Sequence, residues 1–291
     1  MNSFDAILQP TTAASLPIGV FDSGVGGLTV LRALRSRLPD ERFLYLGDTA
    51  RLPYGTKSRD SVLRYSLQAG QFLIDQGIKY LVIACNTASS VAVEELRARF
   101  APIPVIGVIE PGAAAGCGAS RSGEIAVLAT EATVRGGAYQ RAIAALRPDA
   151  VVVARACSIF VALAEEGWTE GPIVEAVIHQ YLDDLLGEYP RVDTLLLGCT
   201  HFPLLMSALR KTIDSRISIV DSAATTAAAL EKDLVAKGLQ AISPSARPIA
   251  LMATDGPERF ARVGTQFLGQ KVAAEDVELV DLAMNQRVPA A

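Results

Sequence analysis

Residues 17–38, PIGVFDSGVGGLTVLRALRSRL, begin with an apolar run of strand length and end with an amphipathic stretch of helical length. The run 17–21 shows no alternation of apolar and polar residues, which is typical of a strand buried on both faces of a sheet. Residues 28–38 place apolar side chains at spacings of three and four, with arginines between them, which predicts a helix. A buried strand followed by a helix is the repeating unit of a parallel α/β fold.

The same unit recurs along the chain. Apolar runs that predict buried strands lie at 17–21, 43–46, 80–84, 104–108, 125–129, 150–154, 194–197, 217–220 and 248–252. Amphipathic stretches that predict helices lie at 28–38, 58–76, 89–100 and 133–146. Strands that alternate with helices form βαβ units with right-handed crossovers. The sequence therefore predicts the α/β class with parallel sheets.

The composition favours a globular protein that acts on small molecules. Half of the 291 residues are apolar and 20% are charged, which excludes the disordered class. We expect no transmembrane helix, because no uncharged apolar run reaches about 18 residues. The net charge of −4 offers no basic surface for nucleic acid or an anionic membrane. Residues 1–17 lack the features of a signal peptide and are predicted to be an N-terminal extension of a cytoplasmic protein.

Two stretches of small residues suggest where the chain passes between domains. The stretch 111–123, PGAAAGCGASRSG, is either a helix with a tightly packed face or a crossing between domains. Residues 222–229 follow a predicted strand and are a candidate for the return crossing. We therefore predict a first α/β domain of residues 18–112 and 225–291, and a second of residues 113–224.

The two halves repeat a pattern of polar residues at strand ends. In the first half an early strand runs into Asp22 and a later strand delivers Cys85, and in the second half Thr130 and Cys199 occupy the corresponding places. Either a duplication or a chance match of generic α/β units produces such a pattern. Ligands of open α/β sheets bind at the carboxyl ends of strands. Two similar domains related by a pseudo-two-fold axis would thus face one another across an active-site cleft.

The four cysteines divide into two groups by their surroundings. A cytoplasmic chain keeps its thiols reduced, so a disulfide framework is not expected. Cys117 and Cys157 lie among small or apolar residues and are predicted to fill the core. Cys85 and Cys199 each end a strand and precede residues that can open a helix. Because backbone amides and the helix dipole lower the pKa of a thiol at that place, both are predicted to be reactive.

The other chemistry-bearing residues are ambiguous when taken alone. His201 is a candidate metal ligand, proton partner or ordinary loop histidine, whereas His179 lies in a predicted helix, 176–186, as a partly exposed surface residue. Asp22 lacks the second aspartate, two residues on, that acylphosphate-forming sites carry. The glycine run 24–27 lacks both the dinucleotide-binding spacing and the lysine of a phosphate-binding loop.

Four motifs, taken together and in order, resemble the cofactor-independent aspartate/glutamate racemase superfamily and, within it, the glutamate racemases. They are VFDSGVGGLTVLRAL at 20–34, GDTARLPYGTKS at 47–58, ACNTAS at 84–89 and LLLGCTHFPLL at 195–205. The resemblance runs from about Ile18 into the last third of the chain. It departs at 156–162, where Ser158 and Ala162 replace the usual prolines, and at Ala132, which replaces a glycine.

The resemblance implies a two-base racemisation of glutamate that needs neither pyridoxal phosphate nor a metal. Cys85 would deprotonate D-glutamate and Cys199 would deprotonate L-glutamate, while the other thiol donates a proton on the opposite face. The D-glutamate would supply peptidoglycan synthesis. The implied partner is glutamate alone, without nucleic acid or membrane, and the resemblance is compatible with a homodimer.

The resemblance also assigns supporting roles. Asp22 would assist Cys85, and His201 with Glu165 would assist Cys199, although Glu166 fits the same acidic position. The matching positions for substrate binding are Asp22, Ser23, Pro53, Tyr54, Gly55, Asn86, Thr87, Thr130, Thr133 and Thr200. Backbone amides at helix N-termini would suit the substrate carboxylates.

Three other functions are compatible with parts of the pattern. An aspartate racemase, or another amino-acid racemase of the superfamily, differs from a glutamate racemase in pocket depth by one methylene. A zinc hydrolase would use Cys85, Cys199, His201 and Asp22 as ligands. A solute-binding module with a cleft between two lobes would bind its ligand without chemistry, and would leave the two thiols without a purpose.

Overall fold

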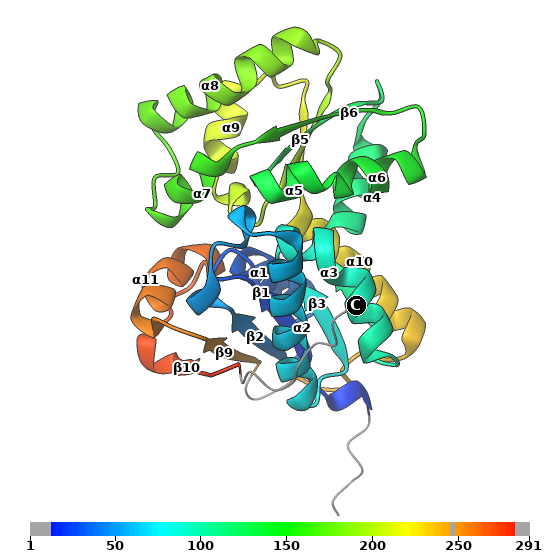
Figure 1. The fold of residues 1–291 in the computed structure, drawn as a ribbon, viewed down its shortest axis with the longest axis vertical. Coiled ribbons are helices and arrows are strands. Elements are labelled where there is room, and N and C mark those ends of the chain that lie inside the picture. Colours follow the sequence, from blue (N-terminus) through cyan, green and yellow to red (C-terminus); the bar gives the residue numbers. More distant parts are fainter. Residues whose placement is uncertain (1–12, 245–247, 283–291) are drawn as a thin grey trace, which may run out of the picture.

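The computed structural model describes residues 13–244 and 248–282, which form two lobes stacked one above the other (Figure 1). Every strand predicted from the sequence is present, and β10 is an additional one. The strands are β1 (Ile18–Asp22), β2 (Phe43–Gly47), β3 (Tyr80–Ile83), β4 (Val105–Gly107), β5 (Glu124–Ala129), β6 (Val151–Ala156), β7 (Thr194–Gly198), β8 (Ser218–Asp221), β9 (Ile249–Ala253) and β10 (Val277–Leu279).

The strands form two sheets in which every pair is parallel. The first sheet has the order β10-β9-β2-β1-β3-β4, and the second has the order β6-β5-β7-β8. The second order repeats the run β2-β1-β3-β4 of the first, with β5 in the place of β1 and β7 in the place of β3. The predicted α/β class with two parallel sheets is confirmed.

Helices connect the strands, as the alternation of the sequence predicts. They are α1 (Leu28–Arg37), α2 (Arg59–Asp75), α3 (Asn86–Phe100), α4 (Ile109–Ala119), α5 (Glu131–Gly136), α6 (Ala138–Leu146), α7 (Ser158–Glu165), α8 (Pro172–Glu188), α9 (Met206–Thr212), α10 (Ser222–Lys237) and α11 (Pro257–Leu268). The prediction of one helix over 133–146 is wrong. Gly137 has a left-handed φ of +62° there and separates α5 from α6, because glycine adopts this conformation at low cost.

Each sheet carries an apolar core on both faces. In the first lobe α1, α10 and α11 pack on one face, where Leu31, Leu230 and Phe267 are fully buried, and α2 and α3 cover the other. In the second lobe α7, α8 and α9 cover one face of the sheet, and α4 and α6 cover the other. Helices on both faces of parallel strands explain why the strand sequences read as continuous apolar runs.

Two predicted strands are less buried than expected. The residues of β6 and β8 are exposed or half-buried, and Val151 at the start of β6 is 47% exposed. Both strands lie at the edges of the four-stranded sheet, where a strand has a neighbour on one side only. The prediction that 150–154 and 217–220 are buried on both faces is therefore wrong.

The chain passes between the lobes twice. Helix α4 follows β4 of the first sheet and packs on the second, while α10 follows β8 of the second sheet and packs on the first. The small-residue stretch 111–123 is thus a helix along most of its length, and 222–229 is the first half of α10. The expected boundaries at 112/113 and 224/225 fall inside these two helices. Residues 1–12 of the expected extension lie outside the described residues.

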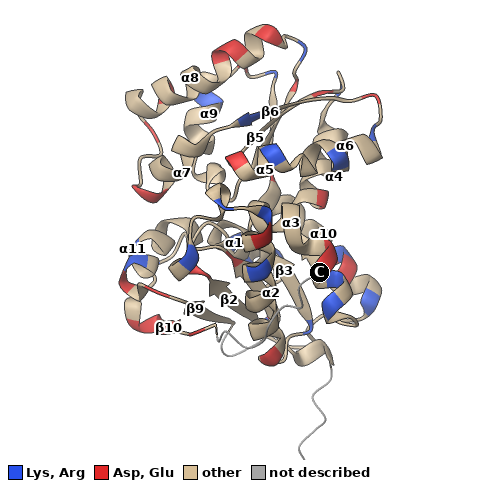
Figure 2. Cartoon of the chain, in the orientation of Figure 1, with Lys and Arg blue, Asp and Glu red and all other residues tan. Residues whose placement is uncertain are grey.

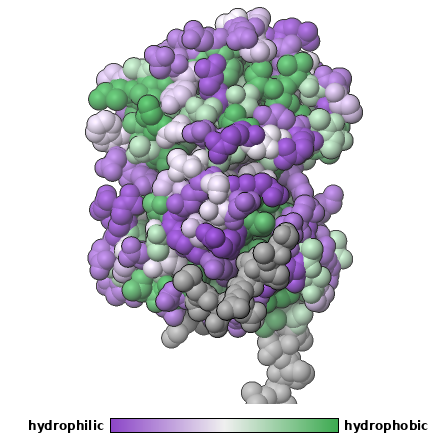
Figure 3. All heavy atoms as spheres, in the orientation of Figure 1, coloured by the Kyte–Doolittle hydropathy of each residue, from purple (hydrophilic) through white to green (hydrophobic). Residues whose placement is uncertain are grey.

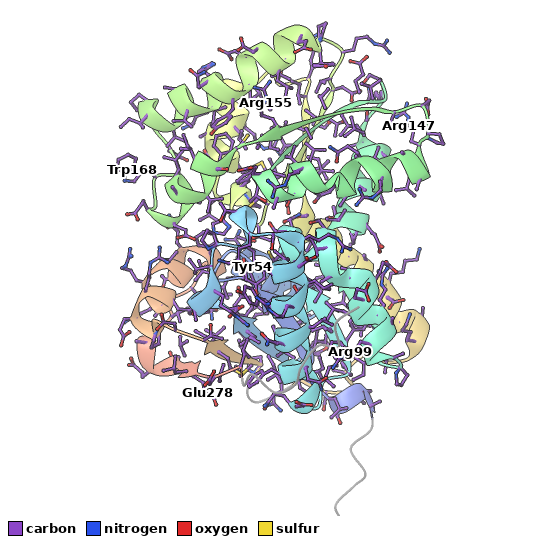
Figure 4. All side chains as sticks on the ribbon, viewed as in Figure 1. Tyr54, Arg99, Arg147, Arg155, Trp168 and Glu278 are labelled. Atoms are coloured by element: carbon purple, nitrogen blue, oxygen red, sulfur yellow. The ribbon has the colours of Figure 1, made fainter. Side chains whose placement is uncertain are left out.

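The surface carries charges of both signs and some apolar patches. Figure 2 shows acidic and basic residues interspersed over both lobes. Figure 3 shows a largely hydrophilic face on which apolar residues reach the surface in patches. Trp168, which is 54% exposed, projects from the connection between α7 and α8 (Figure 4). Within the described ranges, no helix is long and apolar enough to cross a membrane.

Candidate active site

The carboxyl ends of strands from both sheets meet at one cavity of about 190 Å³. Its walls come from both lobes, and Tyr54 lies where the lower lobe in Figure 4 faces the upper one. Most of the predicted site residues line it: Ser23, Pro53, Tyr54, Gly55, Cys85, Asn86, Thr87, Thr130, Cys199, Thr200 and His201. Three other predicted residues, Asp22, Thr133 and Glu165, do not line the cavity but lie behind residues that do. Thr56, Ser158 and Val161 line it and were not predicted.

Cys85 is placed by β3 and α3 of the first lobe. Strand β3 runs parallel to β1, and the N–H of Ala84 donates to Phe21 O, so the chain after β3 stays beside the end of β1. Cys85 is the N-cap of α3, and its Sγ accepts the N–H of Ala88 over 3.4 Å. The same sulfur lies 3.5 Å from Ser23 Oγ. The first thiol is therefore held at a helix N-terminus, with a hydroxyl as neighbour.

Asp22, the last residue of β1, is fully buried behind this wall. Its Oδ2 accepts the N–H of Gly24 over 2.8 Å, whereas Oδ1 has no hydrogen-bond partner among the described residues. Burial raises the pKa of Asp22, and the positive charge of His201 and the backbone N–H of Gly27 offset only part of that rise. A buried carboxyl with a raised pKa and a free oxygen can take up a proton.

The pKa of Cys85 is shifted in the direction opposite to the prediction. Burial raises it first and the negative charge of Asp22 raises it further, so that it reaches about 12. The hydroxyl of Ser23 and the N–H of Ala88 lower it, as expected at a helix N-terminus, but they do not outweigh burial. At neutral pH Cys85 is therefore a thiol, which is the form that donates a proton.

Cys199 lies in a different setting at the end of β7. The residues after it form a turn and then a four-residue 3-10 helix, η4 (Phe202–Leu205), so Cys199 does not cap an α-helix as predicted. Its Sγ lies 3.8 Å from His201 Nδ1 instead. The Nε2 of His201 lies 3.1 Å from Glu165 Oε1, and the other oxygen of Glu165 accepts a hydrogen bond from Arg259 Nη2 over 2.8 Å.

The charges along this chain reinforce one another. Burial on its own lowers the pKa of His201, but hydrogen bonds and charges from Cys199 and Glu165 outweigh burial and raise it to about 10. Burial raises the pKa of Glu165, but His201 and Arg259 outweigh it and bring it to about 2. At neutral pH His201 is therefore an imidazolium and Glu165 a carboxylate. Glu166, the alternative acidic residue, is exposed, and among the described residues the hydrogen bond to His201 Nε2 comes from Glu165.

Hydroxyl and amide groups join the two lobes along one side of the cavity. Thr87 Oγ1 of the first lobe lies 3.0 Å from Thr130 Oγ1 and 3.4 Å from Thr133 Oγ1 of the second. Asn86 Nδ2 donates to Tyr139 OH over 2.7 Å, while Asn86 Oδ1 has no hydrogen-bond partner among the described residues. The described lining includes no lysine or arginine. Hydroxyls and backbone N–H groups would therefore bind a carboxylate here.

Gly26, in the glycine-rich stretch 24–27, allows the two lobes to approach closely. A β-carbon at Gly26 would overlap the imidazole ring of His201 and the hydroxyl of Thr200. Beside it, Thr29 Oγ1 donates to the carbonyl oxygen of Thr200 over 2.8 Å. In this structure the missing side chain makes room for His201.

The remaining cysteines and His179 lie outside the site. Cys157 is fully buried in the core of the second lobe, which confirms its predicted role, and Cys117 is half-buried on α4. His179 is exposed on α8 and lies 2.9 Å from Asp183 Oδ1, as expected for a surface residue. In residues 13–244 and 248–282, no three or more of His, Cys, Asp and Glu are placed to hold a metal ion. The donor geometry thus gives no support to the zinc hydrolase.

The site residues missed from the sequence differ in how visible they were. Thr56 lies inside the motif 47–58, while Ser158 and Val161 lie in the stretch 156–162, where the chain departs from its resemblance. All three lie in stretches that the resemblance already covered, so the sequence could have nominated them as site residues. Arg259 belongs to no motif and reaches Glu165 from helix α11, 94 residues away in the chain. Only the fold reveals this contact.

Comparison with known proteins identifies the family of this chain. A family model described as Asp/Glu/Hydantoin racemase matches residues 28–230. A glutamate racemase of Geobacter metallireducens is 47% identical over 267 residues, which cover 91% of this chain and 96% of that protein.

Two crystal structures are similar to this fold. The glutamate racemase of Francisella tularensis in complex with D-glutamate has a TM-score of 0.85 at 36% identity, and covers 92% of this chain and 98% of its own. That of Thermus thermophilus in complex with beta-chloro-D-alanine has a TM-score of 0.83 at 42% identity, with the same coverage. The chain belongs to the Asp/Glu/hydantoin racemase family.

Proposed function

We propose that this protein interconverts L-glutamate and D-glutamate by proton transfer at the α-carbon, with Cys85 and Cys199 as the two bases. The observation that carries the proposal is that two thiols, one from each lobe, line the same cavity. Racemisation needs a base on one face of the α-carbon and an acid on the other. The two lobes supply one such group each.

The charges around the thiols favour one starting state. The imidazolium of His201 beside Cys199 stabilises negative charge on that sulfur, whereas Asp22 and burial keep Cys85 protonated. In the direction from L-glutamate, the Cys199 thiolate takes the α-proton, and the electron pair stays on the substrate as a carbanion. The Cys85 thiol then gives its proton to the opposite face, which yields D-glutamate, a Cys199 thiol and a Cys85 thiolate.

The reverse direction starts from the complementary state. Cys85 must first lose its proton, which Asp22, with its raised pKa and free Oδ1, is suited to accept, and the Cys199 thiolate must gain a proton from solvent. The Cys85 thiolate then removes the α-proton of D-glutamate, and the Cys199 thiol protonates the other face. Because Cys199, His201 and Glu165 are joined by contacts, the imidazolium stabilises the thiolate that Cys199 becomes.

The lining supplies the groups that a glutamate would need. The backbone N–H groups at the N-terminus of α3 and the hydroxyls of Thr87, Thr130 and Thr200 would bind the carboxylates. Asn86 Oδ1, which is buried and without a partner among the described residues, would accept a hydrogen bond from the substrate ammonium. We infer further that the two lobes are domains with boundaries near 112/113 and 224/225, and that the D-glutamate serves peptidoglycan synthesis.

The proposal is tested with the purified protein and both enantiomers of glutamate and of aspartate, with circular dichroism as the readout. We expect turnover of both glutamate enantiomers and much weaker turnover of aspartate. In D₂O, deuterium should enter the product pool before the remaining substrate pool, since each face has its own base. Turnover of aspartate in preference to glutamate, or no turnover of either, would overturn the proposal.

A further inference from the structure

The carboxylate of Glu165 is bound from both lobes at once. One oxygen lies 3.1 Å from His201 Nε2 of the second lobe, and the other accepts a hydrogen bond from Arg259 Nη2 of α11 over 2.8 Å. Helix α11 belongs to the first lobe, where Phe260 and Phe267 anchor it in the core. Each carboxylate oxygen thus has one cationic partner, and the two partners come from different lobes.

The end of α7 that carries Glu165 is packed against the first lobe. Ala164, the preceding residue, is fully buried within the core of the first lobe rather than that of its own. A β-carbon at Gly167 would lie 3.4 Å from Gln266 Oε1 of α11, which is ordinary van der Waals contact. Glu165 therefore sits at a contact between α7 and α11, and its position depends on how the two helices meet.

His201 is enclosed by the same helix. The ring of Phe267 from α11 packs edge-to-face on the imidazole, with the ring centroids 5.0 Å apart. The titratable and charged groups that act on His201 are Cys199 after β7, Glu165 of α7 and Asp22 of β1. Arg259 acts through Glu165. Of these groups, only Glu165 has its orientation set by a salt bridge to the other lobe.

We propose that Arg259 is a positioning residue for proton transfer at Cys199, because it holds Glu165 against His201 from the opposite lobe. The inference rests on the proposed racemase function and adds the fourth member of the chain Cys199–His201–Glu165–Arg259. Without Arg259, the Glu165 carboxylate can rotate toward solvent, and His201 then loses the hydrogen bond that favours its charged form. Because Arg259 and Glu165 belong to different lobes, the chain is complete only when α7 and α11 are in contact.

The salt bridge alone does not carry the effect. Arg259 is 48% exposed, and an exposed ion pair contributes little to stability. Its role here is geometric, since it fixes a carboxylate that is itself largely buried and in contact with the imidazole. The two effects of Arg259 on His201 have opposite signs. Its positive charge disfavours the imidazolium, whereas the orientation that it gives Glu165 favours it, and the proposal requires orientation to be the stronger effect.

The test uses Arg259→Met and Arg259→Lys in the full chain, with Arg262→Met as the matched control. Arg262 is an exposed arginine of the same helix that makes no ion pair among the described residues. The chain has two histidines, so NMR titration of the ring resonances follows His201, with exposed His179 as an internal reference. The pH profile of kcat is measured for the same variants.

We expect Arg259→Met to lower the pKa of His201 from about 10 by about one unit and to lower kcat roughly fivefold near pH 10, where the two proteins differ most in imidazolium content, with little loss at pH 7. Arg259→Lys should keep most of the His201 pKa and most of kcat, and Arg262→Met should have the same His201 pKa and kcat as the parent protein. An unchanged or raised His201 midpoint in Arg259→Met would overturn the proposal, and so would a loss of kcat that does not depend on pH. Failure of the parent protein to racemise glutamate refutes the proposed function instead, and the titration still tests the contact.

Discussion

The two walls of the cavity have the same topology and opposite electrostatics. Cys85 follows β3 and Cys199 follows β7, and these strands occupy equivalent places beside β1 and β5. Yet Cys85 is buried beside a carboxyl, which raises its pKa, whereas Cys199 lies beside a positively charged His201. Repetition of the fold therefore places two thiols symmetrically, whereas the neighbouring residues put a carboxyl beside Cys85 and an imidazolium beside Cys199.

The electrostatic difference between the two walls comes from positions at which the two lobes carry different residues. The central strand of the first sheet ends in Asp22, whereas the corresponding strand β5 is followed by Thr130, which is neutral. The pair His201 and Glu165 belongs to the second lobe only. A symmetric frame with asymmetric neighbours suits a reaction whose two faces need an acid and a base at the same moment.

Removing either thiol should have the largest effect on activity. We expect Cys85→Ala and Cys199→Ala each to lower racemisation by about 10²–10⁴-fold, because one face loses its acid or base. Proton exchange should survive on the other face. In D₂O, Cys85→Ala should exchange the α-proton of L-glutamate without forming D-glutamate, and Cys199→Ala should do the same with D-glutamate. Racemisation at the parent rate in either variant would refute the two-thiol mechanism.

Glu165→Gln changes the electrostatics beside Cys199 and leaves the neighbours of Cys85 unchanged. Cys199 and Glu165 both raise the pKa of His201. Loss of the Glu165 carboxylate should therefore lower the pKa of His201 from about 10 toward the ordinary histidine value. We expect kcat to fall about 10- to 100-fold at pH 8. Glu166→Gln is the matched control, since Glu166 is adjacent but exposed. Equal losses in both variants would show that the charge of His201 is not what matters.

Asp22→Asn removes the negative charge beside Cys85, so that both central strands have neutral side chains at their carboxyl ends. Because the charge of Asp22 is the second largest cause of the raised pKa of Cys85, removing it should lower the pKa of that thiol below its value of about 12. The rate of alkylation against pH, in a protein that also carries Cys199→Ala, measures this shift. With Cys199 intact, kcat should nevertheless fall about tenfold, since Asp22 no longer accepts the Cys85 proton. A raised pKa or a faster enzyme would contradict the role given to Asp22.

The smallest effect concerns stability. The raised pKa of His201 stabilises the fold fully below the ordinary histidine value of about 6.5, and this contribution is lost as the pH rises through about 10. The lowered pKa of Glu165 stabilises the fold above about 4.3, and this contribution is lost as the pH falls through about 2. The joint contribution should therefore be greatest between about pH 4.3 and 6.5.

Urea unfolding of the parent protein and of His201→Asn measures this contribution. The difference in unfolding free energy should shrink between pH 7 and pH 9.5, by at most about 1.4 kcal/mol per pH unit for one proton. The Cys85 wall offers the contrast, since an Asp22→Asn substitution leaves the His201–Glu165 pair in place. A difference for His201→Asn that grows with pH would show that His201 is not held in its charged form.

Local sequence patterns predicted most of the fold and most of the cavity. The apolar runs located nine strands, because a strand covered by helices on both faces leaves an uninterrupted apolar signature. Strand β10 was missed because its three residues, VEL, form no apolar run. The helix predicted at 133–146 overlooked Gly137, whose left-handed conformation ends α5. The exposure of β6 and β8 depends on which strands end up at a sheet edge, and the sequence of a strand does not state this.

The sequence by itself determined that two thiols stand at strand ends, since that follows from residue order and from the apolar runs before them. Only the tertiary structure decided which charged groups lie beside those thiols, which of Glu165 and Glu166 contacts His201, and that Arg259 contacts Glu165. The physical reason is that a pKa depends on burial and on charges within a few ångströms. Those neighbours come from both lobes and from distant parts of the chain.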